Sequence, residues 1–483
     1  MKESHITKLI TGGDKPPVSI IVRAAVFLAF PAVVEQIMLT AVQFVDTAMV
    51  GRLGADATAA VGLTTSSVWM FQAVFGSASM GFSVQVAQHL GAGRRERAKQ
   101  VVAQSLRVVA ILGMLLGALG FFISFSLPDW LGAEDAVAGP AGTYFRIIAC
   151  GMPMTFGVLM VSSMMRCAGD TKTPMILNTM INIINVTLNF LFIYPTRMVR
   201  IGDASFVVPG LNLGVAGAAI ASITATGTIF IVFLWILFNK EGPIRLTKDV
   251  NGKMDRECLG TAFRFGLPIA MERLTMSGAQ VMQTSIITDI GTVSLATHHL
   301  AVTAESVSYA PAFGVSQAAT TMVGQAIGAE RKGLAMYFAK ISIIMGMILM
   351  TFGGMVLFVF AEPLIGFFSE DGEVVLLGGK VLRIVAFAEP LFAAAIVSSG
   401  ILRGAGDSKV PFIICLSTMW GIRITLSMIF APQVGLVGVW IAMAMELMIR
   451  GSIFLVRVLR GKWVYSGLFK STKTNQVRGG KRC

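Results

Sequence analysis

The sequence predicts an all-α polytopic membrane protein, with twelve transmembrane helices in two pseudo-symmetric six-helix bundles around a central cleft. Three observations predict it: the composition, the number of long apolar segments, and an internal repeat. Of the 483 residues, 55% are hydrophobic and 13% are charged, whereas soluble domains carry about 25% charged residues. Because so few charged side chains cannot cover a water-facing surface, we expect the chain to fold in lipid.

Twelve apolar segments are long enough to cross a bilayer as helices, which takes about 20 residues each. The first six lie near residues 23–50, 57–82, 100–127, 140–166, 174–195 and 213–238. The second six lie near residues 259–287, 293–320, 335–361, 377–402, 411–431 and 435–459. The alternating pattern of membrane-barrel strands is absent from these segments, so we expect helices.

The second half of the chain repeats the first at an offset of 237 residues. The segments that match without a gap are VAQHLGAGRRERA (86–98) with VGQAIGAERKGLA (323–335), and RCAGDTKTP (166–174) with RGAGDSKVP (403–411). We interpret these segments as loops whose Gly, Asp and Pro cap helices and whose Arg and Lys fix topology. Because an even number of spans separates equivalent positions, both copies enter the membrane in the same direction. Two such bundles suit alternating access, in which they rock about a central site.

The net charge of +13 is distributed as a topology signal. Lys and Arg gather at both termini and in alternate loops, whereas the loops 128–135 and 367–373 are acidic. Only the 196–212 loop, with Arg197 and Arg200, runs against this trend. By the positive-inside rule we expect both termini in the cytoplasm, in a multi-pass protein of the cell (inner) membrane. The charge does not predict a nucleic-acid partner.

The predicted organisation has five parts. They are a cytoplasmic N-terminal tail (1–22), an N-lobe bundle (23–238), a cytoplasmic linker (239–258), a C-lobe bundle (259–460) and a basic cytoplasmic tail (461–483). The N-terminal residues have no signal-peptide core, so we expect the first helix to be retained. The five cysteines show no spacing typical of a metal site or a disulfide framework.

The first helix carries two carboxyls, and an ionisable group inside a membrane is a functional hypothesis by default. Glu35 and Asp46 are eleven residues apart, which is three turns, so they share a face about 16 Å apart. Gln43 lies one turn from Asp46 on the same helix. Pro31 allows a bend, either as a static kink, which we favour, or as one that responds to the state of Asp46.

The fifth helix carries a stripe of asparagines. Asn178, Asn182, Asn185 and Asn189 are spaced by 4, 3 and 4 residues and fall on one face. One or two of them would be explained by hydrogen bonds between helices; for four we expect a water-filled cavity. Carboxamide oxygens beside a carboxylate either replace the hydration shell of a small cation or surround a carboxyl that exchanges a proton. Either use makes Asp46 the coupling residue.

The second half lacks these groups. At the 237-residue offset Asp46 aligns with Gln283, and the asparagines align with Cys415, Met419, Ile422 and Leu426. We therefore place the ion-coupling site in the first half. Glu446 has Arg450 one turn away, which favours a structural pair. The residues that could line the cleft are Glu35, Asn178, Glu272, Gln283, Glu305 and Glu389.

These segments together resemble the multidrug and toxic compound extrusion (MATE) family over nearly the whole chain. The resemblance rests on VDTAMVGRLG (45–54), VAQHLGAGRRERA, RCAGDTKTP, FGLPIAMERL (265–274), LATHHLA (295–301) and LRGAGDSKVP (402–411). It implies an antiporter that expels organic, usually cationic, drugs in exchange for Na⁺ or H⁺. It also implies that the first-lobe cation site, a possible Na⁺ site, consists of Asp46, Asn185 and Asn189. No cofactor besides the coupling ion, no obligate protein partner and no enzymatic activity is implied.

The second lobe departs from the sodium-coupled branch of that family. That branch has a Glu further into the seventh helix and an Asp on the tenth. Here Glu272 lies only four residues after Pro268, and Phe392 holds the expected Asp position, with Glu389 the nearest acid. This departure favours coupling through Asp46 and leaves sodium and proton both open.

A second hypothesis is a lipid-linked saccharide flippase of the same superfamily. Such proteins tend to have extra spans and arginines in the central cavity that hold a pyrophosphate. In this sequence twelve spans suffice, and only Arg273 and Arg423 lie well within predicted helices. An enzyme would need a catalytic or metal cluster, and the pair His298-His299 is more typical of packing at a helix end. We therefore favour the exporter.

Overall fold

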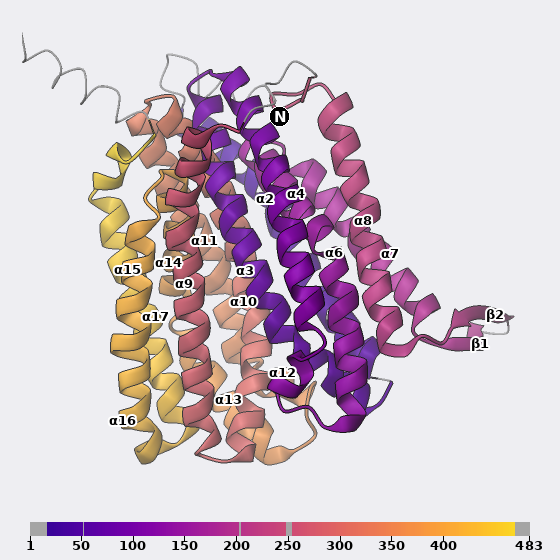
Figure 1. Cartoon of the computed structure of the whole chain (residues 1–483). Coiled ribbons are helices and arrows are strands. Elements are labelled where there is room, and N and C mark those ends of the chain that lie inside the picture. Colours follow the sequence, from indigo (N-terminus) through magenta and orange to yellow (C-terminus); the bar gives the residue numbers. More distant parts are fainter. Residues whose placement is uncertain (1–16, 52, 202–203, 248–253, 469–483) are drawn as a thin grey trace, which may run out of the picture.

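The structure, a computed structural model, describes residues 17–51, 53–201, 204–247 and 254–468. Long helices run up and down through one bundle, and both ends of the described chain lie at the same end of it, here called the terminal end (Figure 1). The N-lobe contains α2 (Val18–Gly51), α3 (Ala55–Gly91), α4 (Arg95–Ile123), α6 (Asp135–Cys167), α7 (Lys172–Phe192) and α8 (Gly214–Asn239). The C-lobe opens with α9 (Arg256–Thr288), α10 (Thr292–Gly328) and α11 (Lys332–Val359).

The last three spans of the C-lobe include two that are irregular. One is the pair α13 (Gly372–Ala386) and α14 (Glu389–Gly404), which is bent by 59° just before Pro390. The next span consists of α15 (Lys409–Thr418), the π-helical turn η1 (Met419–Ile424) and α16 (Thr425–Val434), so it is interrupted in its middle. The last span, α17 (Leu436–Leu459), is regular. Short connecting helices are α5 (Leu127–Trp130), α12 (Ala361–Gly366) and η2 (Lys462–Tyr465). The prediction of twelve helical spans is confirmed.

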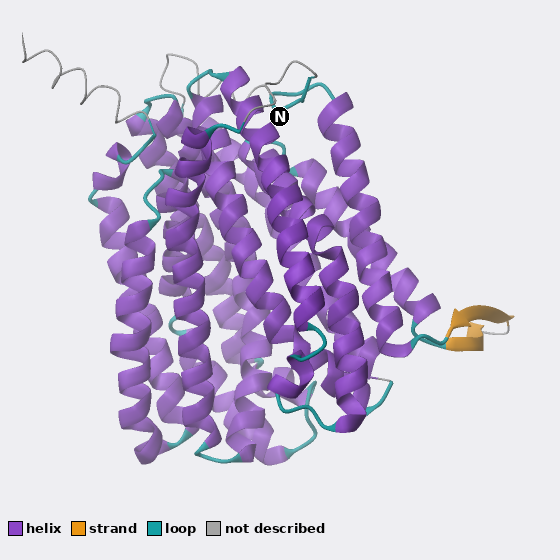
Figure 2. Cartoon of the chain, viewed as in Figure 1, coloured by secondary structure: helices purple, strands orange, loops and turns teal. Residues whose placement is uncertain are grey.

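The segment between α7 and α8, which is expected to be a loop from the sequence, contains strands. Within the described residues, β1 (Pro195–Ile201) and β2 (Ala204–Leu211) form an antiparallel hairpin between α7 and α8. The hairpin projects from the side of the helical bundle (Figure 2). Its register pairs Arg200 with Ser205 and is irregular between Pro195 and Arg197. The hairpin is therefore an appendage and no part of the membrane-spanning bundle.

Three of the long helices are more polar than the rest. By length and apolar composition eight of the described helices qualify as spans, or nine if the bent α13–α14 pair counts as one. The helices α3, α9 and α10 do not qualify. They pack against the opposite lobe, α3 against α9 and α10. A helix that faces another protein surface can carry polar side chains that lipid would exclude.

The repeated segments after the second and eighth spans are helical, which corrects the predicted helix ends. The helix α3 continues to Gly91 instead of residue 82, and α10 continues to Gly328 instead of residue 320. The added turns carry Gln88 and Gln325, which are 0% and 2% exposed. They look like loop residues in sequence because they are polar, but they are buried against the other lobe.

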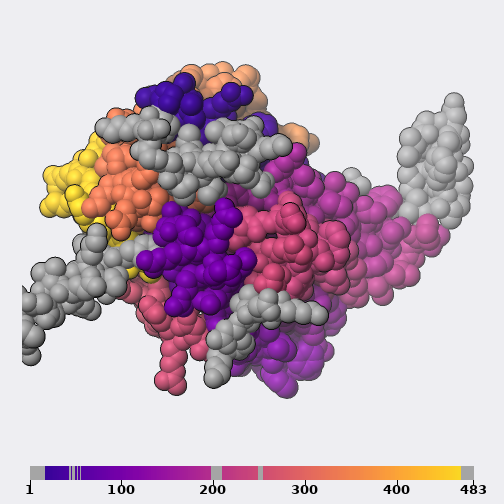
Figure 3. Space-filling view, turned by 90° about the horizontal axis from the view of Figure 1, so that it is seen from above, coloured from indigo at the N-terminus to yellow at the C-terminus, as the bar shows by residue number. Residues whose placement is uncertain are grey.

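The two lobes cross closely at the terminal end. A Cβ on Gly91 would collide with the carbonyl oxygen of Gln325, and a Cβ on Gly328 would collide with that of Gln88. Only glycine lets two helix backbones approach this closely. Figure 3 looks down on this end, where segments from the first and second halves of the chain lie directly against one another.

Two equivalent hydrogen bonds accompany the crossing. The Nε2 atom of Gln88 donates to the carbonyl oxygen of Gly404 at 2.9 Å, and that of Gln325 donates to Cys167 at 2.8 Å. Donors and acceptors are each related by the 237-residue offset. The repeat in the sequence is therefore a pseudo-two-fold arrangement in space.

The hydrophobic cores exchange elements at the same end. The first half of α2, with Leu28 fully buried, packs into the C-lobe core beside Phe338 and Ile401. Reciprocally, Cys258 and Ala262 at the start of α9 pack into the N-lobe core. At the terminal end each lobe therefore contributes residues to the core of the other. The lobe boundaries at 23–238 and 259–460 divide the chain by sequence position alone, and they stay a prediction.

Replacing Gly91 with alanine should force the lobes apart at the terminal end. Overpacking costs about 1–3 kcal/mol, which shifts a two-state equilibrium about 5- to 150-fold. Cys258, 7% exposed and bound through its carbonyl to Gln85, should then react faster with a maleimide. Labelling of each cysteine is measured by peptide mass spectrometry.

The matched control is Gly62→Ala on the same helix, where an added Cβ has nothing within 4 Å. It should leave Cys258 as protected as in the unmodified chain. Equal labelling of Cys258 in both variants would show that the crossing at Gly91 does not hold the terminal end closed.

Candidate functional site

A cavity of about 540 Å³ lies between the two lobes. Helices α3 and α6 line it from the N-lobe, and α9, α10 and α14 line it from the C-lobe. Its walls combine apolar side chains, such as Trp69 and Met276, with amides, hydroxyls and three arginines. The arginines are Arg166, Arg273 and Arg403. A cavity of this size and mixed lining is typical of a small-molecule site.

Two matched ion pairs stand at this cavity. Arg166 Nη1 lies 2.8 Å from Glu35 Oε1, and Arg403 Nη2 lies 2.7 Å from Glu272 Oε1. Partners are 131 residues apart in both pairs, and the 237-residue offset maps one pair onto the other. The carboxylates are 3% and 4% exposed. Each guanidinium therefore lines the cavity with a buried carboxylate behind it.

The pairing has a direct physical cause. A carboxylate inside a membrane protein is costly unless a cation and hydrogen bonds compensate it. Glu35 also accepts a hydrogen bond from Asn178 Nδ2 at 2.7 Å, whereas the equivalent position on the C-lobe side is Cys415. From the sequence, both glutamates are expected to line the cleft, and the arginines are expected to fix topology. The equal spacing within the repeat was the signal that could have joined them.

The asparagine stripe divides between two neighbours. Its first member, Asn178, contacts Glu35 of α2. Further along α7, Asn185 Nδ2 donates to Ser222 Oγ of α8 at 2.9 Å, and Asn189 Nδ2 donates to Asn185 Oδ1 at 3.1 Å. Asn185 and Asn189 are 5% and 3% exposed, and neither lines the cavity between the lobes. Amide and hydroxyl oxygens gathered in this way are ligands that hard cations prefer.

The roles expected for three residues of the first helix stay predictions. Gln43 and Asp46 lie in the helical part of α2, but their side chains are outside the described residues. The coupling role of Asp46, and the Na⁺ site that it would form with Asn185 and Asn189, therefore stay predictions. Pro31 lies inside α2, which is one continuous helix from Val18 to Gly51, and a responsive bend there also stays a prediction.

The acids of the C-lobe are enclosed within that lobe. Glu389, fully buried at the start of α14, accepts a hydrogen bond from Ser308 Oγ at 2.9 Å. Glu305 and Gln283 are 4% and 3% exposed. None of the residues expected to line the cleft lines this cavity. They are Glu35, Asn178, Glu272, Gln283, Glu305 and Glu389. Glu35, Glu272 and Glu389 contact guanidinium or hydroxyl groups because an unpaired carboxylate beside apolar side chains would have a higher free energy.

The predicted contact between Glu446 and Arg450 is present and has a third member. Arg450 Nε lies 3.2 Å from Glu446 Oε1, and Arg423 Nη2 lies 2.6 Å from Glu446 Oε2. Arg423 belongs to the π-helical turn η1, and such a turn changes the direction of the side chains that follow it. All three residues are buried, so Arg423 is committed to this cluster and does not line the cavity.

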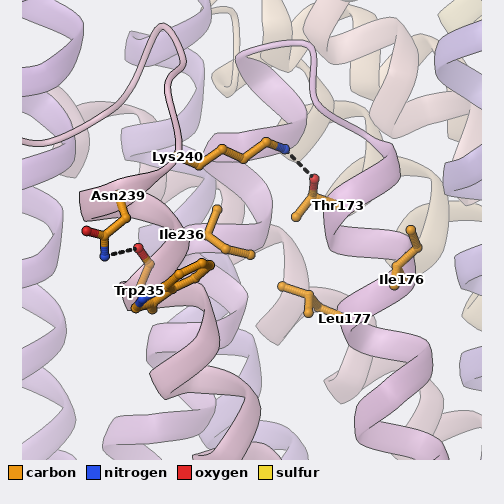
Figure 4. A pocket seen from close by; sticks show the side chains of 7 residues that line it. All are labelled: Thr173, Ile176, Leu177, Trp235, Ile236, Asn239 and Lys240. Atoms are coloured by element: carbon orange, nitrogen blue, oxygen red, sulfur yellow. Dashed lines mark hydrogen bonds between the residues drawn. The ribbon is translucent and has the colours of Figure 1, made fainter.

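A second hollow of about 570 Å³ lies on the flank of the N-lobe, between α7 and α8 (Figure 4). Lys240 donates to Thr173 Oγ1 at 3.1 Å, and Asn239 Nδ2 donates to the carbonyl oxygen of Trp235. A tryptophan and a lysine at a helix end are typical of anchoring at the membrane surface. All residues that line this hollow belong to the N-lobe, so it is not the site between the lobes that alternating access requires.

Comparison with known proteins agrees with this architecture. The sequence model of the MatE family matches residues 31–191 and 268–429, two copies that begin 237 residues apart. The chain belongs to the MatE family. The predicted resemblance is confirmed, and with it the expectation that the protein is no enzyme, since its relatives are transporters.

Individual relatives cover the chain almost completely. A probable multidrug resistance protein NorM from Thermotoga maritima is 29% identical over 442 residues, 90% of this chain and 92% of its own length. A MATE transporter of the MOP superfamily, solved in an outward-facing conformation, has a TM-score of 0.86 at 22% identity and covers 96% and 100% of the chains. A MOP superfamily transporter from Pyrococcus furiosus, also at 0.86 and 22%, covers 96% and 99%. These two structural matches support the MatE fold.

Removing one partner of the Glu272–Arg403 pair should destabilise the protein more than removing both. Arg403→Met leaves a buried, unpaired carboxylate, which costs about 3–5 kcal/mol. Adding Glu272→Gln removes that charge and should restore part of the apparent melting temperature. Thermal unfolding in detergent of the two single variants and the double variant measures the coupling.

The matched control is Arg383→Met, which removes the surface pair with Glu362, whose side chains are 40% and 41% exposed. Surface pairs contribute about 0–1 kcal/mol, so its melting temperature should barely change. A double variant less stable than Arg403→Met alone would contradict the buried-pair interpretation.

Proposed function

We propose that this MatE protein is a secondary active exporter of small organic molecules, driven by a Na⁺ or H⁺ gradient through alternating access. The observation that carries the proposal is a cavity between two equivalent lobes whose described hydrogen bonds to each other all lie toward one end. Such an arrangement has a second state in which the opposite end closes. The relative named for multidrug resistance supports drugs as the exported molecules.

The conformation supports an outward-open state. The positive-inside rule puts the termini in the cytoplasm, so the closed terminal end would face the cytoplasm and the cavity would open to the outside. The match to an outward-facing transporter supports the same assignment. Opening to the inside would break the bonds from Gln88 to Gly404 and from Gln325 to Cys167. Each of these neutral hydrogen bonds stabilises the closed terminal end by about 1 kcal/mol, an amount that ion binding can offset.

The helix α2 connects the proposed ion site to the closed end. Its first half belongs to the C-lobe core, its middle carries Glu35 behind the cavity-lining Arg166, and its last third carries Asp46. It packs against α7, where Asn185 and Asn189 form their network. A cation or proton at Asp46 would therefore act on an element that both lobes share. This linkage supports coupling through Asp46 in exchange for the exported molecule.

The lining of the cavity does not match the charge that the family resemblance implies for the exported molecule. The family resemblance implies organic cations, yet no Asp or Glu is among the described residues that line the cavity. The Pyrococcus furiosus transporter is described as having a binding pocket of reverse polarity that suggests a different function. The fold therefore does not set the polarity, and the lining of each cavity must decide it.

Asp46→Asn should abolish gradient-driven export while leaving insertion and folding intact. The amide keeps the shape of the side chain but neither exchanges a proton nor supplies the charge that holds a cation. The measurement is dye efflux from vesicles under an imposed Na⁺ or H⁺ gradient. Asp56→Asn, at an exposed position in the first turn of α3, is the control and should export normally. Normal export by Asp46→Asn would contradict the coupling role of Asp46.

Asn185→Leu should weaken the dependence on the coupling ion. It removes the bonds to Ser222 and Asn189, and two neutral hydrogen bonds at about 1 kcal/mol each predict about a thirtyfold higher half-saturating ion concentration. Thr187→Val, on an exposed face of the same helix, is the control. If both variants show the same ion dependence as the unmodified chain, the asparagines take no part in ion binding.

A further inference from the structure

We propose that the cavity between the lobes binds an anionic group, a carboxylate or a phosphate, of an amphiphilic organic molecule, with Arg273 as its principal contact. The inference rests on the proposed transport function and adds the charge of the molecule that is moved. It reverses the cationic substrate that the family resemblance implies.

The charges along the cavity wall carry the inference. The charged side chains that line it are Arg166, Arg273 and Arg403, without Asp, Glu, Lys or His among the described lining residues. The first and last are neutralised from behind by Glu35 and Glu272. Arg273 makes no hydrogen bond or ion pair with any other residue of the described chain, and its side chain is exposed where it lines the cavity. The wall therefore has one arginine that no carboxylate of the described chain pairs directly.

Helix geometry separates Arg273 from the carboxylate next to it. Successive residues on an α-helix point about 100° apart. Glu272 points to Arg403 of α14, and Arg273 lies on another side of α9, toward the lumen of the cavity. A guanidinium surrounded by low-dielectric walls costs free energy unless an anion approaches it, and such a cleft concentrates anions. A cationic molecule would meet repulsion at the same place.

The other two arginines add donors. Arg166 and Arg403 each use one amino group for the glutamate behind them. A guanidinium has five N–H donors in a planar fork that fits carboxylate and phosphate oxygens. Together with hydroxyls such as Ser277 on the same wall, they can complete the hydrogen bonds of an oxyanion.

The remaining lining suits an apolar body attached to that head group. Trp69 is 62% exposed and lines the cavity from α3, and Ile269 and Met276 line it from α9. An aromatic face and thioether side chains accept varied apolar shapes. The volume of about 540 Å³ lies within the range of drug-sized ligand sites. The ligand class is thus a hydrophobic molecule with one acidic group.

The internal repeat shows that Arg273 is not part of the shared frame. The 237-residue offset maps Glu35 and Arg166 onto Glu272 and Arg403, but it maps Gln36 onto Arg273. The N-lobe keeps its ion pair with a neutral amide at this position. The arginine is therefore dispensable for the frame, and Arg273→Gln installs the residue that the other copy already uses.

The test compares two probes with the same aromatic body and opposite charge. Equilibrium binding of 1-pyrenebutyrate and of a pyrenebutyl trimethylammonium ion is measured on the full chain in nanodiscs, with empty nanodiscs subtracted. We expect the carboxylate to bind and Arg273→Gln to weaken it about tenfold or more, the range of a hydrogen bond to a charged group. Arg273→Lys should recover part of the affinity. Arg264→Gln, at an exposed position of α9 away from the cavity, should leave it unchanged.

Preferred binding of the cationic probe, or carboxylate binding that Arg273→Gln leaves unchanged, would overturn the proposal. Folding is checked by elution as a single species and by the Arg273→Lys variant. Because binding is measured without a gradient, loss of gradient-driven efflux with carboxylate binding intact would count against the proposed transport mechanism alone. The two failures are therefore distinguishable.

A second arm separates the two sources of such an anion. Vesicles containing the full chain are assayed for efflux of free 1-pyrenebutyrate and for flipping of a fluorescent phosphatidic acid, followed by dithionite quenching. Efflux that Arg273→Gln reduces assigns a free organic acid, and flipping that it reduces assigns a lipid phosphate. Movement of neither anion, with efflux of the cationic probe intact, would overturn the proposal.

Discussion

The buried contact between a glutamate and an arginine, made once in each lobe, is the interaction on which the rest of the site depends. Glu35 and Glu272 are buried inside a membrane protein, where a lone carboxylate is strongly unfavourable. Each is compensated by the arginine that ends a helix of its own lobe, Arg166 or Arg403. The same contact connects α2 to α6 and α9 to α14, and it places a guanidinium on the cavity wall.

The closed end of the molecule follows from a different constraint, the close approach of two backbones. Gly91 and Gly328 permit α3 and α10 to cross, and the buried amides of Gln88 and Gln325 then reach carbonyl groups of the opposite lobe. These bonds are neutral and few, so the interface is specific without being very strong. An interface of that kind suits a protein that must separate the same surfaces in each transport cycle.

Function in this fold is expected where the repeat fails. The frame of glycines, ion pairs and helix ends is shared by both copies, and it builds the lobes and the cavity. Asp46 has no acidic counterpart in the second copy, and Arg273 has no basic counterpart in the first. If the two copies were identical, both lobes would present the same side chains to the cavity. The two departures separate a proposed cation site in the N-lobe from a proposed anion contact on the C-lobe wall.

The sequence by itself determined the fold class, the twelve spans and the repeat, because apolar length and a constant offset are properties of the chain alone. It also selected Glu35 and Glu272 as groups that need an explanation. Only the tertiary structure decided what they contact, because partners 131 residues apart meet through helix packing that no local pattern encodes. For the same reason Gln88 and Gln325 looked like loop residues and proved to be buried. The direction of Arg273 into the cavity, and hence the charge of its wall, was likewise decided by how α9 packs against α3 and α15.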